Sequence, residues 1–478
     1  MPRDDLKTVP NNHSVCSDRP SGRPAFTSPT LMDKLDTLTV EEFGRRFRAR
    51  EVTAEEITEA CLRRIDERNP RLNAFILVMA ETARQQAREA DRELAAGRDR
   101  GPLHGVPISV KDLIDVAGTP TTAASRVREG HVARHDAAVI VALREAGAVL
   151  IGKTNLHEFA FGTTNEESAF GPAHNPHDPT RSPGGSSGGS AASVAAGMAL
   201  ATIGTDTGGS IRIPAAACGI VGLKPGYGEV STEGVVPLSR RLDHVGPLAR
   251  TVTDVSLLYR AIKDGSKPGT PAPRPVSTLR LGVPRDYFCD MLDDEVRVRF
   301  DESVDCLRAA GARVEDITLR HASLTSTVYL HLVLADAAAY HAPTLESMPE
   351  RYTAPVRLRL EMGRYVLAQD YVRALEGRDV LRREVDSALA VHDILLLPTL
   401  PIPAPPIGVP SLIVGGKSEP VRNLMLRQTQ LFNLTGHPAI ALPAGRTGTG
   451  LPCSVQLVGA ETEQLLPAAL ACETHLSR

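Results

Sequence analysis

The chain has 478 residues, of which 42% are hydrophobic and 23% charged, and its formal net charge is −3. This weak charge gives no long-range attraction to nucleic acid or to an anionic membrane, and a chain with 4% aromatic residues and no Trp lacks the stacking platform of a single-strand binder. Seven scattered cysteines without C-x-x-C spacing, and the lack of any run of 18 apolar residues, predict a cytoplasmic protein without disulfides, a zinc site or a membrane-spanning helix.

The N-terminal part begins irregularly and then becomes helical. Residues 1–31 are polar, rich in Pro, Ser and Asn, and contain no apolar core of a signal peptide. We expect a disordered arm here, or a translation start at Met32, where regular patterning begins. Helices are predicted to start at Thr39 and Thr53, because each is followed three residues later by Glu, as in a capping box. A third helix is predicted over 81–96.

The rest of the chain alternates between apolar runs and segments of helical spacing, which predicts an α/β protein with helices on both faces of a mixed sheet. Apolar runs, the first two of strand length, occupy 106–110, 148–152, 280–284 and 393–398, and helix-compatible segments occupy 136–146, 191–201 and 321–390. A Gly/Pro-rich surface connection is predicted over 265–279, and an extended loop over 398–410. We expect one domain over 32–478, in which 321–390 is a helical insertion that covers the substrate.

Two glycine-flanked serines and one lysine carry the chemical signal. Ser186 in GGSSGGS and Ser210 in TGGSIRIP lie 24 residues apart, and Lys111 lies 75 residues before Ser186, at the end of the apolar run in GVPISVKD. A serine attacks a carbonyl only when a base takes its proton, and a lysine is such a base only when it is neutral. Glycines beside a serine let backbone N–H groups approach the reacting carbonyl. The three segments indicate an acyl-transfer hydrolase that uses no histidine.

Two other interpretations of the first serine segment are weaker. A Gly/Ser run is often a flexible linker, but a linker has no reason to be followed by a second Gly-Gly-Ser that ends in IRIP. Residues 184–188 also fit the G-x-S-x-G pattern of the nucleophile elbow, which requires a strand directly before it. The preceding HDPTRSP is unsuited to a central strand, so we do not favour the elbow.

Phosphate and metal sites are not favoured either. Residues 147–154 (GAVLIGKT) satisfy the phosphate-loop pattern, but their middle positions are those of a buried strand, so we interpret Lys153 as structural or solvent-exposed. Two histidine pairs have no carboxylate or cysteine at zinc-ligand spacing and are interpreted as surface or capping residues: His131 with His135, and His174 with His177. We predict no metal and no cofactor.

At the serine and lysine segments the chain resembles the amidase signature family. The resemblance covers most of residues 35–475 and rests on GVPISVKD (105–112), the run from Lys153 to Gly197 with PGGSSGGSAASVAAG, GTDTGGSIRIPAAACGIVGLKP (204–225), LDHVGPLARTV (242–252) and GLPCSVQLVG (450–459). It implies a mixed α/β sheet of about eleven strands with helices on both faces, and a Ser–cisSer–Lys triad.

Carried over by position, the resemblance implies Ser210 as the nucleophile, Ser186 after a cis peptide bond as the bridging serine, and Lys111 as the base. For Lys111 to be neutral near pH 7–8, its pKa must fall by ~2–3 units, which burial would produce. The resemblance also implies oxyanion-hole N–H groups from Thr207, Gly208, Gly209 and Ser210. The remaining implied site residues are the supporting Ser187, Asp206 and Arg212, and Ala160, with its backbone carbonyl beside the substrate.

The family contains free-standing amidases and the glutaminase subunit of tRNA-dependent amidotransferases. That subunit holds the ammonium of glutamine with an acidic residue seven positions before the asparagine of an NLAG segment. Here the segment is NLTG from Asn433, the corresponding residue is Leu426, and 421–433 contains no acid. We therefore expect a free-standing amidohydrolase, a monomer or homodimer acting on a small-molecule amide; the alternative is the glutaminase subunit. The substrate stays open among aryl and aliphatic amides, esters, carbamates and peptide-end amides.

Overall fold

The computed structural model describes residues 34–264 and 271–476, so the predicted arm over 1–31 lies outside the described residues. Its centre is an 11-stranded sheet in the order β1-β3-β2-β4-β6-β5-β12-β13-β9-β7-β8, which confirms the expected mixed sheet. The strands of this sheet are β1 (Phe75–Val78), β2 (Pro107–Lys111), β3 (Val149–Thr154), β4 (Ala201–Asp206), β5 (Val221–Lys224), β6 (His244–Ala249), β7 (Arg280–Pro284), β8 (Arg313–Ile317), β9 (Ile394–Pro398), β12 (Ala439–Arg446) and β13 (Pro452–Val458).

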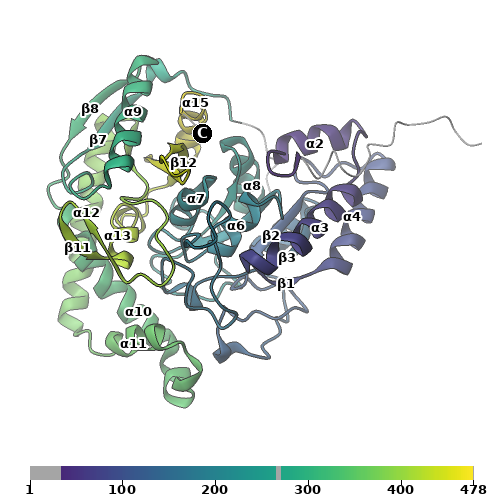
Figure 1. The fold of residues 1–478 in the computed structure, drawn as a ribbon, viewed down its shortest axis with the longest axis horizontal. Helices are drawn as coiled ribbons and strands as arrows, with labels where there is room; N and C mark the ends of the chain where they lie inside the picture. Colours follow the sequence, from purple (N-terminus) through teal and green to yellow (C-terminus); the bar gives the residue numbers. More distant parts are fainter. Residues whose placement is uncertain (1–33, 265–270, 477–478) are drawn as a thin grey trace, which may run out of the picture.

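Helices cover both faces of the sheet, and Figure 1 shows α2–α4 at the end that carries β1–β3 and α10–α12 toward the opposite end. The helices are α2 (Val40–Arg48), α3 (Ala54–Leu72), α4 (Ala80–Ala95), α5 (Ala138–Glu145), α6 (Gly188–Ala195), α7 (Arg212–Cys218), α8 (Val252–Asp264), α9 (Asp294–Ala309), α10 (Thr325–Ser347), α11 (Ala354–Gly363), α12 (Ala368–Val391), α13 (Val421–Leu426), α14 (Leu431–Leu434) and α15 (Thr462–Glu473). A separate hairpin joins β10 (Ser411–Val414) and β11 (Lys417–Pro420).

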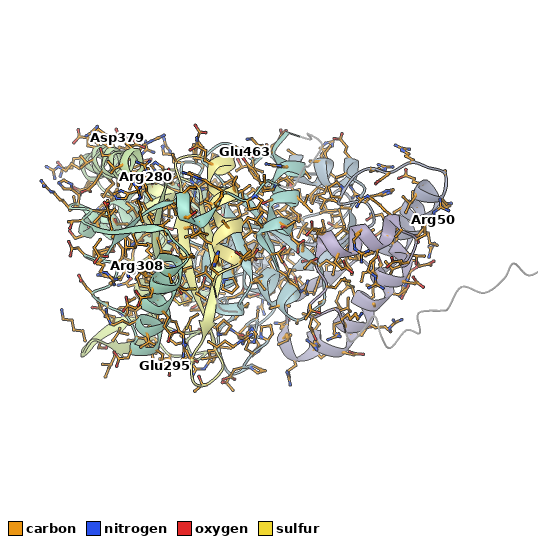
Figure 2. All side chains as sticks on the ribbon, turned by 90° about the horizontal axis from the view of Figure 1, so that it is seen from above. Arg50, Arg280, Glu295, Arg308, Asp379 and Glu463 are labelled. Carbon is orange, nitrogen blue, oxygen red and sulfur yellow. The ribbon has the colours of Figure 1, made fainter. Side chains whose placement is uncertain are left out.

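Parallel pairing in the centre of the sheet brings functional segments together. Strand β2 is parallel to both of its neighbours, β3 and β4. The carboxyl ends of these strands therefore lie at one edge, where β2 ends in Lys111 and β4 ends in Asp206. All three strands are buried along their whole length, whereas the charged residues labelled in Figure 2, such as Arg280 and Glu463, are exposed.

Local signals placed the starts of α2 and α3 correctly. Thr53 and Glu56 form the reciprocal capping box of α3. The Thr39 side chain accepts a hydrogen bond from the Glu42 N–H in the first turn of α2. The predicted helical segment 191–201 was wrong at its end, because α6 stops at Ala195 and residue 201 already belongs to β4. Gly197 turns the chain there with φ +67, and a Cβ on it would lie 3.1 Å from the backbone of Leu35.

The segment 321–390 is helical, as predicted. It consists largely of α10, α11 and α12, which pack on one another. By length and mean hydropathy, 1.2 over its most apolar window, residues 322–347 suit a membrane span, although no run of 18 apolar residues is present. Half of that window is buried inside the protein, as in a core helix. The predicted extended loop 398–410 has no regular element after β9, only a bridge between Arg181 and Pro406.

Candidate active site

Lys111 is completely buried at the end of β2. Its Nζ donates to Ser186 Oγ at 2.7 Å and to Thr205 Oγ1 at 2.8 Å. Among the described residues, no carboxylate forms an ion pair with it. Burial lowers the pKa of Lys111 to about 7, and the more distant charges of Asp206 and Asp243 oppose this shift only in part. Lys111 is therefore neutral in a large fraction of molecules at neutral pH.

The segment that carries Ser186 is held by close backbone packing. The peptide bond between Gly185 and Ser186 is cis, as the resemblance implies. A Cβ on Gly185 would lie 2.9 Å from the backbone of 163–165, so only glycine fits at this position. The His157 N–H donates to the Ser186 carbonyl at 3.1 Å, and the Ser187 N–H donates to the Ser210 carbonyl at 3.2 Å. This second bond ties the two serine segments together.

Ser210 lies in the turn between β4 and α7 and is 5% exposed, whereas Ser186 and Lys111 are fully covered. A substrate from solvent therefore reaches Ser210 before the other two. No hydrogen bond joins the two serine hydroxyls within the described part of the chain. The structure thus places Lys111 beside Ser186 and leaves the Ser210 hydroxyl open toward a ligand.

The turn 207–210 fixes its peptide planes through its carbonyl groups. Thr429 Oγ1 donates to the Gly208 carbonyl at 2.6 Å, and the Ile213 N–H donates to that of Gly209 at 2.7 Å. The N–H groups of Gly208, Gly209 and Ser210 have no acceptor in residues 34–264 and 271–476. Fixed N–H groups without a protein acceptor next to a serine hydroxyl are the arrangement that an oxyanion hole requires.

A buried ion pair supports this turn from behind. Arg212 Nε and Nη2 donate to the two Asp206 carboxylate oxygens at 3.0 and 2.9 Å, and both residues are fully buried. Asn433 Nδ2 donates to Asp206 Oδ1 at 2.8 Å, and Arg212 Nη1 donates to Gln456 Oε1 at 2.6 Å. Burial acts to raise the pKa of Asp206, but the Arg212 charge outweighs it and holds the pKa well below its usual range. The pair stays ionised and anchors α7.

Thr205, Thr207 and Asp243 complete the surroundings of Lys111. Thr207 Oγ1 donates to Asp243 Oδ1 at 2.6 Å, and burial raises the pKa of Asp243 to about 6. Ser187 Oγ donates to the Thr205 carbonyl at 3.2 Å. This bond holds Thr205 in place, and its hydroxyl accepts from Lys111 Nζ. The sequence did not single out Thr205, the resemblance named Thr207 only for its N–H group, and Asp243 was visible only as part of LDHVGPLARTV.

Ala160 ends the short turn 158–160, in which both Phe159 and Ala160 adopt positive φ, +50 and +59. It lines a small cavity with Thr205 and Thr207, on the Lys111 side of the site. No N–H group of the described residues donates to the Ala160 carbonyl. That carbonyl therefore has no backbone N–H donor among the described residues, and its place beside the substrate stays a prediction.

The residues of the rejected motifs have structural roles. Lys153 lies in β3 and is fully buried, with its Nζ 3.0 Å from Asp112 Oδ1, so the structural interpretation is confirmed and the solvent-exposed one is wrong. His131 and His135 are exposed. His174 bonds the Pro179 carbonyl in a loop at 2.6 Å, and His177 bonds the carbonyl of Cys218, the last residue of α7, at 2.9 Å. No strand lies directly before Ser186, since β3 ends at Thr154 and the described residues 155–185 contain no strand, as argued against the nucleophile elbow.

Comparison with known proteins agrees with this geometry. The sequence model described as "Amidase" matches residues 56–465. The chain belongs to the amidase family. It is 40% identical to an amidase of Pseudomonas putida over 88% of this chain and 92% of that protein. It is 39% identical to the A subunit of the glutamyl-tRNA(Gln) amidotransferase of Carboxydothermus hydrogenoformans, over 92% of this chain and 97% of that protein.

The fold of this amidase-family hydrolase is also found in solved structures. A crystal structure of an amidase superposes with a TM-score of 0.87 at 39% sequence identity, covering 92% of this chain and all of that chain. The mixed sheet, its helices and the serine segments thus belong to one family architecture. The relatives include both free amidases and amidotransferase subunits, so the family alone leaves the substrate open.

Proposed function

We propose that this chain is a free-standing amidohydrolase that cleaves a small carboxylic amide through an acyl-enzyme on Ser210. The observation that carries the proposal is the 2.7 Å contact between Lys111 Nζ and Ser186 Oγ at a buried lysine without an ion-pair partner in the described residues. A lysine in this state takes a proton, whereas an ion-paired lysine keeps its own. Esters and carbamates present the same reacting carbonyl and are included as substrates.

In the acylation step, Lys111 Nζ takes the proton of Ser186 Oγ, which takes that of Ser210 Oγ as this oxygen attacks the carbonyl carbon. The negative charge that forms on the carbonyl oxygen is bound by the free N–H groups of the 207–210 turn. The tetrahedral intermediate collapses with cleavage of the C–N bond, and the leaving amine takes the proton back from Lys111 through Ser186. Water then attacks the acyl-enzyme by the same proton path and frees Ser210.

The alternative is the glutaminase subunit of an amidotransferase, and the 39% identity to the Carboxydothermus hydrogenoformans protein favours it. The residue at the position expected to hold the glutamine ammonium argues against it. Leu426 Cδ2 would lie 3.1 Å from a Cβ built on Gly208, so a hydrocarbon side chain borders the 207–210 turn at this point. An ammonium group there would lose water without gaining a carboxylate.

A substrate panel with the purified chain tests the proposal. We expect hydrolysis of simple amides, anilides or esters without added subunits, and loss of that hydrolysis in Ser210→Ala. Ammonia release from glutamine that requires added partner subunits would instead support the glutaminase. Hydrolysis that persists in Ser210→Ala would refute Ser210 as the nucleophile.

A further inference from the structure

Helix α11 has two apolar faces, and only one of them is packed inside the protomer. Its inner face is formed by Val356, Leu360 and Gly363, all of which are buried. Its outer face carries Leu358 and Met362, which are 58% and 49% exposed. An apolar stripe on a helix normally packs against a partner, so the outer face of α11 needs one beyond the residues that the structure describes.

The exposed apolar face continues beyond the end of α11. Leu358, Met362 and Tyr365 follow the i, i+4, i+7 spacing that places side chains on one side of a helix. Tyr365 is 83% exposed, and Leu367, directly before α12, is 56% exposed. Figure 1 shows α11 at the outer edge of the molecule, next to α10, on which it packs. We call these four residues the α11 stripe.

The α11 stripe has the apolar area that a dimer interface requires. At the exposures given above, its four side chains present roughly 500 Å² of largely apolar surface, near the upper end of what a monomer usually shows in one patch. A stable dimer buries about 800 Å² on each protomer, and about 65% of a homodimer interface is apolar. The apolar share is then about 500 Å² on each protomer, which the stripe supplies.

The charged side chains that border the stripe balance one another. Arg357 pairs with Glu361 at 3.4 Å along α11, and Arg364 pairs with Glu346 of α10 at 3.7 Å. When two copies of one surface meet, a net charge on that surface repels itself. Two arginines paired with two glutamates cause no such repulsion. The same balance gives no attraction to an anionic lipid surface, so a second copy of this chain suits the stripe better.

We propose that the α11 stripe is a homodimer interface, in which the stripe of one protomer packs against the same stripe of its partner around a twofold axis near Met362. Met362 lies midway along the stripe, and its flexible thioether side chain fills the irregular gaps of such a contact. Arg357 and Arg364 then lie at the polar rim of the interface. The interface is separate from Ser210, so its test does not depend on the proposed function.

Sedimentation velocity of the purified full chain tests this interface. We expect a dimer at micromolar concentration. Leu358→Glu and Met362→Glu should each raise the Kd of the dimer by at least about 100-fold, because each places two like charges in one apolar contact. Ile413→Glu is the matched control, since Ile413 is 78% exposed on the β10–β11 hairpin, outside the stripe, and it should leave the Kd unchanged. Circular dichroism should be the same for all three variants, because each replaced side chain is exposed in the protomer.

A mixing experiment identifies the occupant of the stripe as a second copy. Met362→Glu and Met362→Lys should each be monomeric alone, and an equimolar mixture should form dimers again, because opposite charges then meet near the axis. A wild-type chain that stays monomeric up to about 100 µM, a dimer that survives both glutamate variants, or a mixture that stays monomeric would overturn the interface. So would a monomeric chain that binds phosphatidylcholine vesicles and loses that binding in Met362→Glu, because the stripe would then dock on lipid.

Discussion

Lys111 and Lys153 lie on adjacent parallel strands and are both completely buried, but their ammonium groups have different kinds of partner. Lys153 forms an ion pair with Asp112 at 3.0 Å and also donates to the Pro120 carbonyl and the Thr121 hydroxyl. Lys111 donates only to two hydroxyls. Burial lowers the pKa of both lysines, but only Lys153 has a carboxylate in contact to oppose the shift. The chemical type of the partner, rather than burial, therefore distinguishes the structural lysine from the proposed base.

The arginines repeat this contrast. Arg212 has every part of its guanidinium bonded, to Asp206, Asn433, Gln456 and the Thr429 carbonyl, and it supports α7. Arg422 has no hydrogen-bond acceptor in the described residues, and the one hydrogen-bond partner of Arg359 among them is His157 Nε2, at 3.4 Å. Arg212 therefore holds the fold through its bonded partners, whereas Arg359 and Arg422 form no ion pair among the described residues. Each of the following variants tests one side of this division.

The largest effect is expected for Lys111→Met. Removing a general base costs about 10²- to 10⁴-fold, so kcat/KM at pH 8 should fall by that factor. The free energy of unfolding should change by no more than about 1–2 kcal/mol, because the lost hydroxyl contacts are offset by the lost cost of burying an amine. Steady-state kinetics and urea denaturation measure the two quantities. Near-normal activity at pH 8 would show that Lys111 is not the base.

Lys153→Met should show the reverse pattern. It leaves the Asp112 carboxylate buried without its counter-ion, which typically costs about 3–5 kcal/mol. Urea denaturation should detect this loss, and the double variant Lys153→Met/Asp112→Asn should recover part of it. A loss of unfolding free energy below about 1 kcal/mol would mean that the Lys153–Asp112 ion pair does not stabilise the ends of β2 and β3.

The pH profile should reveal the lowered pKa of Lys111. Only the neutral amine accepts a proton, so kcat/KM should rise about tenfold per pH unit below about 7 and level off above it. Asp243→Asn should move the midpoint to lower pH, because the Asp243 charge raises the pKa of Lys111. A midpoint that stays above pH 9 in the wild-type protein would contradict a buried neutral lysine.

The lowered pKa of Lys111 also affects how the free energy of unfolding depends on pH. The unfolded lysine binds its proton up to about pH 10.4, whereas Lys111 in the folded protein releases it near 7. Between these values the unfolded state binds more protons, so this residue makes the free energy of unfolding rise with pH. In Lys111→Met the slope over this window should be smaller than in the wild type, as measured by urea denaturation at pH 7, 8 and 9.

The smallest effect on stability is expected for Arg422→Met. No described acceptor loses a bond, so the free energy of unfolding should change by less than about 1 kcal/mol or increase. Thermal denaturation in buffer without carboxylates measures this change. A loss of about 3 kcal/mol or more would show that Arg422 has a structural partner and belongs with Arg212.

Short-range patterns in the sequence predicted much of the fold. Capping residues placed α2 and α3, and apolar runs placed β2 and β3 within one or two residues. The number of strands and the triad came from the resemblance, since strand pairing is not visible in a local pattern. The end of α6 was missed because small residues suit both a helix and the turn at Gly197.

The partners of the site residues could not be predicted from local sequence patterns. Thr429 and Gln456 bond Arg212 from more than 200 positions away in the chain. The single sequence gave no sign that Arg359 and Arg422 would share one region without a carboxylate acceptor. Such features depend on which side chains the fold leaves unpaired, and only the assembled structure defines that set.

The central claim is that Ser210, and not the more conspicuous Ser186, forms the covalent intermediate. Rapid acid quenching during turnover of a slow p-nitrophenyl ester, followed by peptide mass mapping, tests it directly. We predict an acyl group on the peptide that contains Ser210, absent in Ser210→Ala and retained in the control Arg357→Gln, which changes an arginine that pairs with Glu361 at 3.4 Å on α11. An acyl group on Ser186, or turnover without any acylated peptide, would contradict the account.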